Sequence, residues 1–239
     1  IGAEMQRFKA AGGVALICCG AGVESSRRAV ELARQYKEVF ATAGVHPEER
    51  ADRDEKELLK LLRMPKVVAV GECGLDYHSE TSDEEKRAQG ELFEFNIGLA
   101  KETRLPLVVH CRNAFQEIFQ SLDANRQLPV MMHCFTGNLE QMQECVRRGW
   151  YVSFGGIITF KNSGSLRDVV KAVPEDRLLI ETDSPYLSPE PVRGMKNEPK
   201  NVKMVAETIA KLRGTSIDQI ERLVYQNMLN LFKKIHEQE

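Results

Sequence analysis

The sequence lacks any run of 18 apolar residues, so it predicts no membrane-spanning helix. Its first residues also lack the basic and then apolar pattern of a secretory signal. The six cysteines form no C-x-x-C pair, which argues against a zinc ribbon, and most lie in apolar runs where a thiol packs as a small hydrophobic group. These absences favour a reducing compartment, and we expect a cytoplasmic protein.

The chain also lacks an excess of charge of either sign. Its 33 Lys and Arg residues face 35 Asp and Glu residues, so the formal net charge is −2. This balance excludes a strongly basic nucleic-acid coat, but it is compatible with an enzyme that handles nucleic acid locally through a metal. The 239 residues contain no linker, low-complexity tract or break in composition. We therefore expect a single domain over residues 1–239.

Short apolar runs alternate with longer amphipathic segments. Most runs are rich in Val and Ile without polar alternation, as in parallel strands covered on both faces. The predicted strands are Gly13–Gly20, Val39–His46, Val67–Glu72, Leu105–His110, Val130–Cys134, Trp150–Phe154 and Leu178–Thr182. The predicted helices are Ala3–Ala11, Val23–Tyr36, Asp54–Arg63, Asp83–Thr103, Ala114–Leu122, Leu139–Arg148 and Ser165–Ala172, with two more in Asn201–Lys234, broken at Gly214.

This alternation predicts an α/β fold with a parallel sheet. Seven strands after an opening helix fit a TIM-type (β/α)8 barrel that lacks its first strand in this chain, and we expect that architecture. An open doubly wound sheet is the rival. No Gly-rich phosphate loop follows an early strand, however, and the turn Cys19–Val23 offers only a G-x-G fragment.

Five side chains able to bind metal fall at the carboxyl ends of predicted strands. In a barrel these ends meet at one mouth, where active sites are built. A single histidine or acid at such a place is more often structural, but coincidence explains the whole set poorly, because buried acids rarely lack a partner. Imidazole and carboxylate together suit divalent ions such as Zn²⁺ or Mn²⁺. The five are His46, Glu72, His110, His133 and Asp183.

The remaining histidines and the neighbouring cysteines have simpler interpretations. His78 lies in a predicted loop and His236 in a polar tail, so both are expected at the surface. Cys111 and Cys134 each follow a histidine of the set. Because adjacent strand residues point to opposite faces, we expect both thiols to pack toward the helices.

Six motifs occur in the order and at the spacing of the TatD family of metal-dependent deoxyribonucleases. The sequence therefore resembles this family from about Gly13 to the C-terminus. The motifs are Gly44–Pro47 (GVHP), Gly71–Tyr77 (GECGLDY), Val109–Arg112 (VHCR), Met132–Gly137 (MHCFTG), Val152–Gly156 (VSFGG) and Ile180–Leu187 (IETDSPYL), with Pro191–Gly194 and Asn197–Pro199 also fitting.

The resemblance implies a barrel with two divalent metal ions (Mg²⁺, Mn²⁺ or Zn²⁺) and phosphodiesterase activity on DNA. Carried over by position, Glu72 is the bridging carboxylate, and His110 and His133 are ligands of one ion. Asp183 is a ligand of the other ion and the partner of the nucleophilic water, so Glu72 and Asp183 are the expected catalytic residues. His46 corresponds to a histidine that we assign to the substrate phosphate.

Two arginines are candidates for binding phosphate, which suits the planar guanidinium group. They are Arg112, for which a salt bridge at the rim is an equal alternative, and Arg193. Many family members begin with a strand that ends in His-x-His, and another branch carries a Gly-x-Asn-type sequence there. No His-x-His is present here, so we expect the natural chain to extend upstream, and the composition of the first metal site stays open.

A nearly neutral chain suits a cup that accepts a strand end better than a surface that wraps a duplex. We therefore expect an exonuclease on single-stranded DNA or strand ends, acting as a monomer or small homo-oligomer. One rival is a metal-dependent hydrolase of a small amide, lactone or phosphotriester on the same scaffold. That rival would be favoured by a bridging lysine at a strand end, and none occurs there. A non-catalytic scaffold is the second rival.

Overall fold

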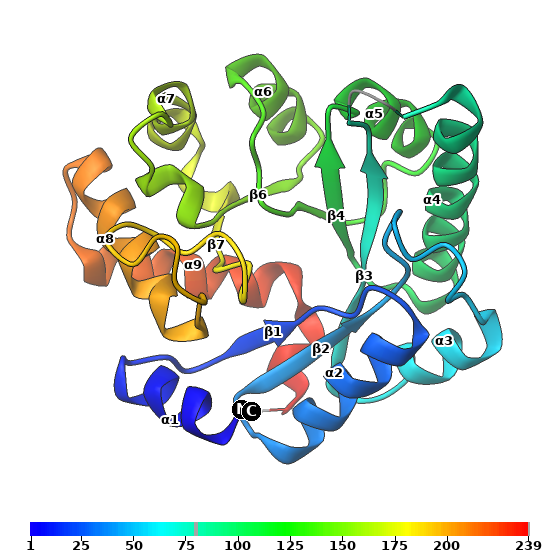
Figure 1. Ribbon diagram of the computed structural model, residues 1–239, viewed down its shortest axis with the longest axis horizontal. Coiled ribbons are helices and arrows are strands. Elements are labelled where there is room, and N and C mark those ends of the chain that lie inside the picture. Colours follow the sequence, from blue (N-terminus) through cyan, green and yellow to red (C-terminus); the bar gives the residue numbers. More distant parts are fainter. Residues whose placement is uncertain (79–80, 239) are drawn as a thin grey trace. The chain divides into compact units, whose positions relative to one another are not determined.

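A computed structural model describes residues 1–78 and 81–238 (Figure 1). The chain divides into two compact units. One comprises Ala15–His133 and Leu231–Glu239, and the other comprises Ile1–Val14 and Cys134–Asn230. We call them the His46 unit and the Asp183 unit, after one residue of each. The single domain expected over residues 1–239 stays a prediction.

The His46 unit is a run of parallel strands, each followed by a helix. Neighbouring strands pair in sequence order, as βα units predict. Helix α2 packs on β2 and α4 packs on β3. The strands are β1 (Leu16–Cys18), β2 (Val39–Ala43), β3 (Val67–Asp76), β4 (Leu107–Arg112) and β5 (Val130–Met132), and the helices are α2 (Val23–Gln35), α3 (Glu55–Leu62), α4 (Asp83–Thr103) and α5 (Phe115–Asp123), with the terminal 3-10 helix η4 (Lys233–Gln238).

The Asp183 unit repeats the alternation around two parallel strands, β6 (Tyr151–Phe154) and β7 (Leu178–Ile180). Gly214, with a φ of 65°, ends α8 at the predicted break. The helices are α1 (Gly2–Ala10), α6 (Leu139–Arg147), α7 (Gly164–Ala172), α8 (Val202–Arg213) and α9 (Ile217–Leu231), with the 3-10 helices η1 (Gly156–Thr159), η2 (Glu175–Arg177) and η3 (Pro199–Asn201). Every predicted strand and helix is thus present in the described residues.

Local signals in the sequence explain where helices begin. The side chain of Ser82 accepts a hydrogen bond from the amide of Glu85, and the carboxylate of Glu85 accepts one from the amide of Ser82. Helix α4 therefore begins with a capping box. Asn138 and Gln141 form the same arrangement at α6. No helix in the described residues is long and apolar enough to cross a membrane.

Strand β3 differs from the prediction, because it continues beyond Glu72 to Asp76. Its register against β4 shifts between Val70 and Cys73. Gly71 and Gly74 stand in this segment with φ values of 145° and 136°, which L side chains rarely adopt. The irregularity is a bulge that redirects side chains at the end of a strand.

Replacing Gly74 by Ala should destabilise the protein by at least about 2 kcal/mol, through a strained backbone and overpacking. A Cβ at this position would overlap the carbonyl oxygen of His110. Urea unfolding followed by circular dichroism would measure the change.

The matched control is Gly90→Ala in α4, where a Cβ meets nothing within 4 Å. It should stabilise the protein by about 0.5–1 kcal/mol, because alanine loses less backbone entropy in a helix. Equal stability of the two variants would contradict the role given to Gly74.

Candidate metal centre

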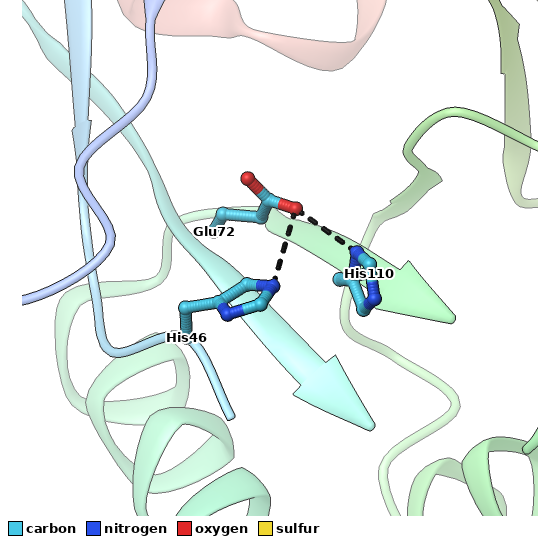
Figure 2. A group of neighbouring side chains, drawn as sticks. All are labelled: His46, Glu72 and His110. Carbon is cyan, nitrogen blue, oxygen red and sulfur yellow. Dashed lines mark ion pairs between the residues drawn. The ribbon is translucent and has the colours of Figure 1, made fainter. Parts of the chain in front are cut away.

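Three imidazoles of the His46 unit surround one carboxylate oxygen. Oε1 of Glu72 lies 3.2 Å from Nδ1 of His110, 3.6 Å from Nε2 of His133 and 3.8 Å from Nε2 of His46. Figure 2 shows His46, Glu72 and His110 pointing toward one another, and their ligand atoms all lie within 4.8 Å. Four of the five predicted metal-capable residues therefore form one cluster, which we call the Glu72 cluster.

Neighbouring parallel strands position the Glu72 cluster. Glu72 lies in the β3 bulge, and His110 on β4 pairs with Gly74. His133 directly follows β5, and its amide donates to the carbonyl of Val109 at 2.9 Å. His46 follows β2, and its amide donates to the carbonyl of Ala21 at 3.0 Å. Residues on or shortly after four consecutive strands, β2 to β5, thus converge, although Glu72 lies within β3 and not at the strand end where it was predicted.

The electrostatics of the cluster favour a charged Glu72. Burial raises the pKa of Glu72, but His133, His110 and His46 more than offset this effect and lower it to about 2. Burial lowers the pKa of His110, yet the hydrogen bonds and charges of Glu72 and Asp76 raise it above its usual value. For His46 burial dominates, and its pKa is lowered. One full negative charge therefore lies among three imidazoles.

This donor set fits a divalent cation. Imidazole nitrogens of His110 and His133 lie close to the carboxylate of Glu72, and all three side chains are less than a quarter exposed. Imidazole and carboxylate are the ligands that Zn²⁺ and Mn²⁺ take in catalytic sites. The residues present could hold an ion at Glu72.

Comparison with known proteins agrees with this chemistry. The family described as TatD related DNase matches residues 2–233. The chain belongs to the TatD family. The metal-dependent hydrolase YabD of Bacillus subtilis is 41% identical over 234 residues, 96% of this chain and 91% of the relative. The 3'-5' ssDNA/RNA exonuclease TatD of Salmonella typhimurium is 35% identical over 241 residues, with coverages of 96% and 91%.

The fold of a solved TatD homologue matches as well. YjjV of Escherichia coli K12 superimposes with a TM-score of 0.91 at 30% identity, over 97% of this chain and 91% of that one. The predicted α/β fold of the TIM-barrel type is thereby confirmed. As a TatD family member, the chain is a metal-dependent hydrolase.

One residue that sequence reasoning did not single out joins the TatD site. Asp76, at the end of β3, places Oδ2 2.8 Å from Nε2 of His110. Arg112 lies 3.7 Å from the other carboxylate oxygen of Asp76 and is 58% exposed, which leaves open both of its predicted roles. The missed signal was spacing: Glu72 and Asp76 are four residues apart, so strand alternation points both to one face.

The other predicted residues of this TatD protein lie in the Asp183 unit. Asp183 follows β7 with a φ of 57°, and its carbonyl accepts a hydrogen bond from the amide of Tyr186 at 2.8 Å. The guanidinium of Arg193 stacks 4.1 Å from the ring centroid of Phe160. The roles of Asp183 and Arg193 stay predictions.

Adding Mn²⁺ or Zn²⁺ to EDTA-treated protein should raise its stability, because an ion that binds only the folded state stabilises it by about 2.7 kcal/mol at 100 times Kd. Glu72→Gln should lose most of this gain, since it removes the charge at the centre of the Glu72 cluster. Thermal unfolding with and without metal would measure it.

Glu102→Gln is the matched control, because Glu102 is 47% exposed and pairs with Arg63 on the surface. This variant should respond to metal as the unaltered protein does. A full metal response in Glu72→Gln would mean that the ion binds elsewhere.

Proposed function

We propose that this TatD protein is an exonuclease that hydrolyses phosphodiester bonds of single-stranded DNA with two divalent ions. The observation that carries the proposal is the Glu72 cluster, in a chain 35% identical to a protein named as a 3'-5' ssDNA/RNA exonuclease. From that relative we infer 3'-to-5' polarity. We further propose action in the cytoplasm, as a monomer or small homo-oligomer.

The proposed roles follow the chemistry of each side chain. His110 and His133 would hold one ion, Glu72 would bridge to the second, and Asp183 would ligate the second. The ions would supply Lewis acidity that lowers the pKa of water and offsets charge on phosphate oxygens. Asp183 would accept the proton of the attacking water. We further propose that residues 1–239 form a single domain.

A hydrogen bond supports the assignment of His46 to the substrate. Nδ1 of His46 accepts from the amide of Glu48 at 3.3 Å. The lowered pKa of His46 keeps the ring neutral at neutral pH, so its single proton lies on Nε2, the nitrogen that faces Glu72. A protonated nitrogen cannot bind a metal but can donate to a phosphate oxygen. We therefore assign His46 to the scissile phosphate.

End-labelled single-stranded DNA should be shortened stepwise when Mn²⁺ or Mg²⁺ is present and should stay intact in EDTA. Glu72→Gln and Asp183→Asn should each lower the rate by about 100-fold or more, the contribution expected of a positioned acid or base. A 5'-label would show a ladder of shortened products if the polarity is 3'-to-5'.

Undiminished cleavage by either variant would remove that residue from the mechanism. If the purified protein binds metal but cleaves no nucleic acid, the hydrolase of a small amide, lactone or phosphotriester becomes the better assignment.

Arg112→Ala should raise KM for DNA about 10-fold or more, because a charge-assisted hydrogen bond to phosphate contributes about 1.5–3 kcal/mol. The KM of Arg112→Lys should lie between those of the unaltered protein and Arg112→Ala, since lysine keeps the charge and loses the planar fork. Steady-state cleavage at saturating metal would give the KM of each variant.

Arg126→Ala is the control for Arg112, because Arg126 is 70% exposed and pairs with Asp123 on the same unit. It should leave KM unchanged. An unchanged KM in Arg112→Ala would identify the arginine as a structural partner of Asp76.

A further inference from the structure

Asp76 is an acid that the fold both buries and fixes in place. Asp76 is only 4% exposed. The amide of Asp76 donates to Oε1 of Gln89 at 2.8 Å, and Nε2 of Gln89 donates back to the carbonyl of Asp76 at 3.0 Å. Gln89 is itself buried in α4. A helix thus clamps the backbone of Asp76, and its carboxylate has a defined position.

The ring of His110 lies between two carboxylates. Nε2 is 2.8 Å from Oδ2 of Asp76, and Nδ1 is 3.2 Å from Oε1 of Glu72. An ionised carboxylate only accepts hydrogen bonds, so in the charged ring Nε2 donates to Asp76 and Nδ1 donates to Glu72. When the ring gives up one proton to bind a cation, the shorter contact keeps the N–H on Nε2, and the lone pair lies on Nδ1 on the side of Glu72. Only a nitrogen with a free lone pair can bind a metal ion.

We propose that Asp76 is a positioning residue that holds His110 in the tautomer and orientation that present Nδ1 to a divalent cation at Glu72. The inference rests on the proposed metal-dependent function and assigns a new role within that site. Histidine ligands commonly donate their second N–H to a carboxylate, which fixes the ring and raises its basicity.

The contacts of the second oxygen of Asp76 favour this role over a surface ion pair. Oδ1 is buried and accepts no hydrogen bond from any residue that the structure describes. Its nearest basic neighbours are Nε2 of His78 at 3.6 Å and Nη1 of Arg112 at 3.7 Å, both beyond hydrogen-bond distance and on half-exposed side chains. The one short contact of the Asp76 carboxylate in the described residues is therefore the one to His110.

The test is a titration of EDTA-treated full chain with Mn²⁺ alone, followed by the electron paramagnetic resonance of the free ion. Asp76→Asn keeps the shape and removes the charge, whereas Asp76→Ala removes the contact. Both should weaken the Kd for Mn²⁺ by about 10–100-fold and leave the number of ions bound at saturation unchanged. Asp123→Asn, at a side chain 43% exposed, is the matched control and should bind as the unaltered protein does.

A second readout reports the tautomer itself. Long-range ¹H–¹⁵N NMR of the metal-free protein, at a pH where the rings are neutral, should show the proton of His110 on Nε2. His110→Gln would assign the signal. In Asp76→Ala the signal should shift toward a mixture of the two tautomers, which a merely structural role for Asp76 would not produce.

Three outcomes would overturn the proposal: an unchanged Kd in both folded variants, a lower number of bound ions at saturation, which would make Asp76 a ligand, or a His110 proton on Nδ1. The isosteric Asp76→Asn keeps the test valid if Asp76→Ala unfolds. No nucleic acid is used, so a protein that binds Mn²⁺ but cleaves no DNA would refute the nuclease proposal and leave this one standing.

Discussion

The burial of a charged Glu72 is the constraint on which the site depends. Removing a carboxylate from water is costly, and the charged form persists only if opposite charge or hydrogen bonds replace the lost hydration. Here His133, His110 and His46 do so, and they hold the pKa of Glu72 at about 2. These histidines lie on or shortly after three different strands. The parallel order of β2 to β5 is what lets residues so distant in sequence meet at one oxygen.

Much of this arrangement could be predicted, because parallel strands that are covered by helices on both faces appear in the sequence as continuous apolar runs. Runs of Val and Ile located the strands, and the polar residue that ends each run had to lie at the common edge. That reasoning placed His46, Glu72, His110 and His133 together, as the distances confirm. It failed at β3, because Gly71 and Gly74 resemble the end of a strand. The two glycines instead permit a bulge with positive φ, and the strand continues to Asp76.

The three histidines are not equivalent, and only the family resemblance, not the strand pattern, distinguished His46 from His110 and His133. What each ring can do depends on the partner of the nitrogen that faces away from Glu72. For His46 that partner is the amide of Glu48, a donor. For His110 it is the carboxylate of Asp76, an acceptor. The first leaves a proton facing Glu72 and the second leaves a lone pair, so two identical residues at neighbouring strand ends suit opposite tasks.

Asp76 shows how the site departs from what stability alone would select. A buried acid with one oxygen that accepts no hydrogen bond from the described residues carries a desolvation cost, and apolar residues of similar volume often replace such groups without loss. The fold nevertheless clamps Asp76 through Gln89 and directs it at His110. Burial also makes this contact useful, because a low dielectric strengthens the hydrogen bond that orients the ring. A surface carboxylate, exchanging its partners with water, would leave both ring nitrogens of His110 free to take the proton.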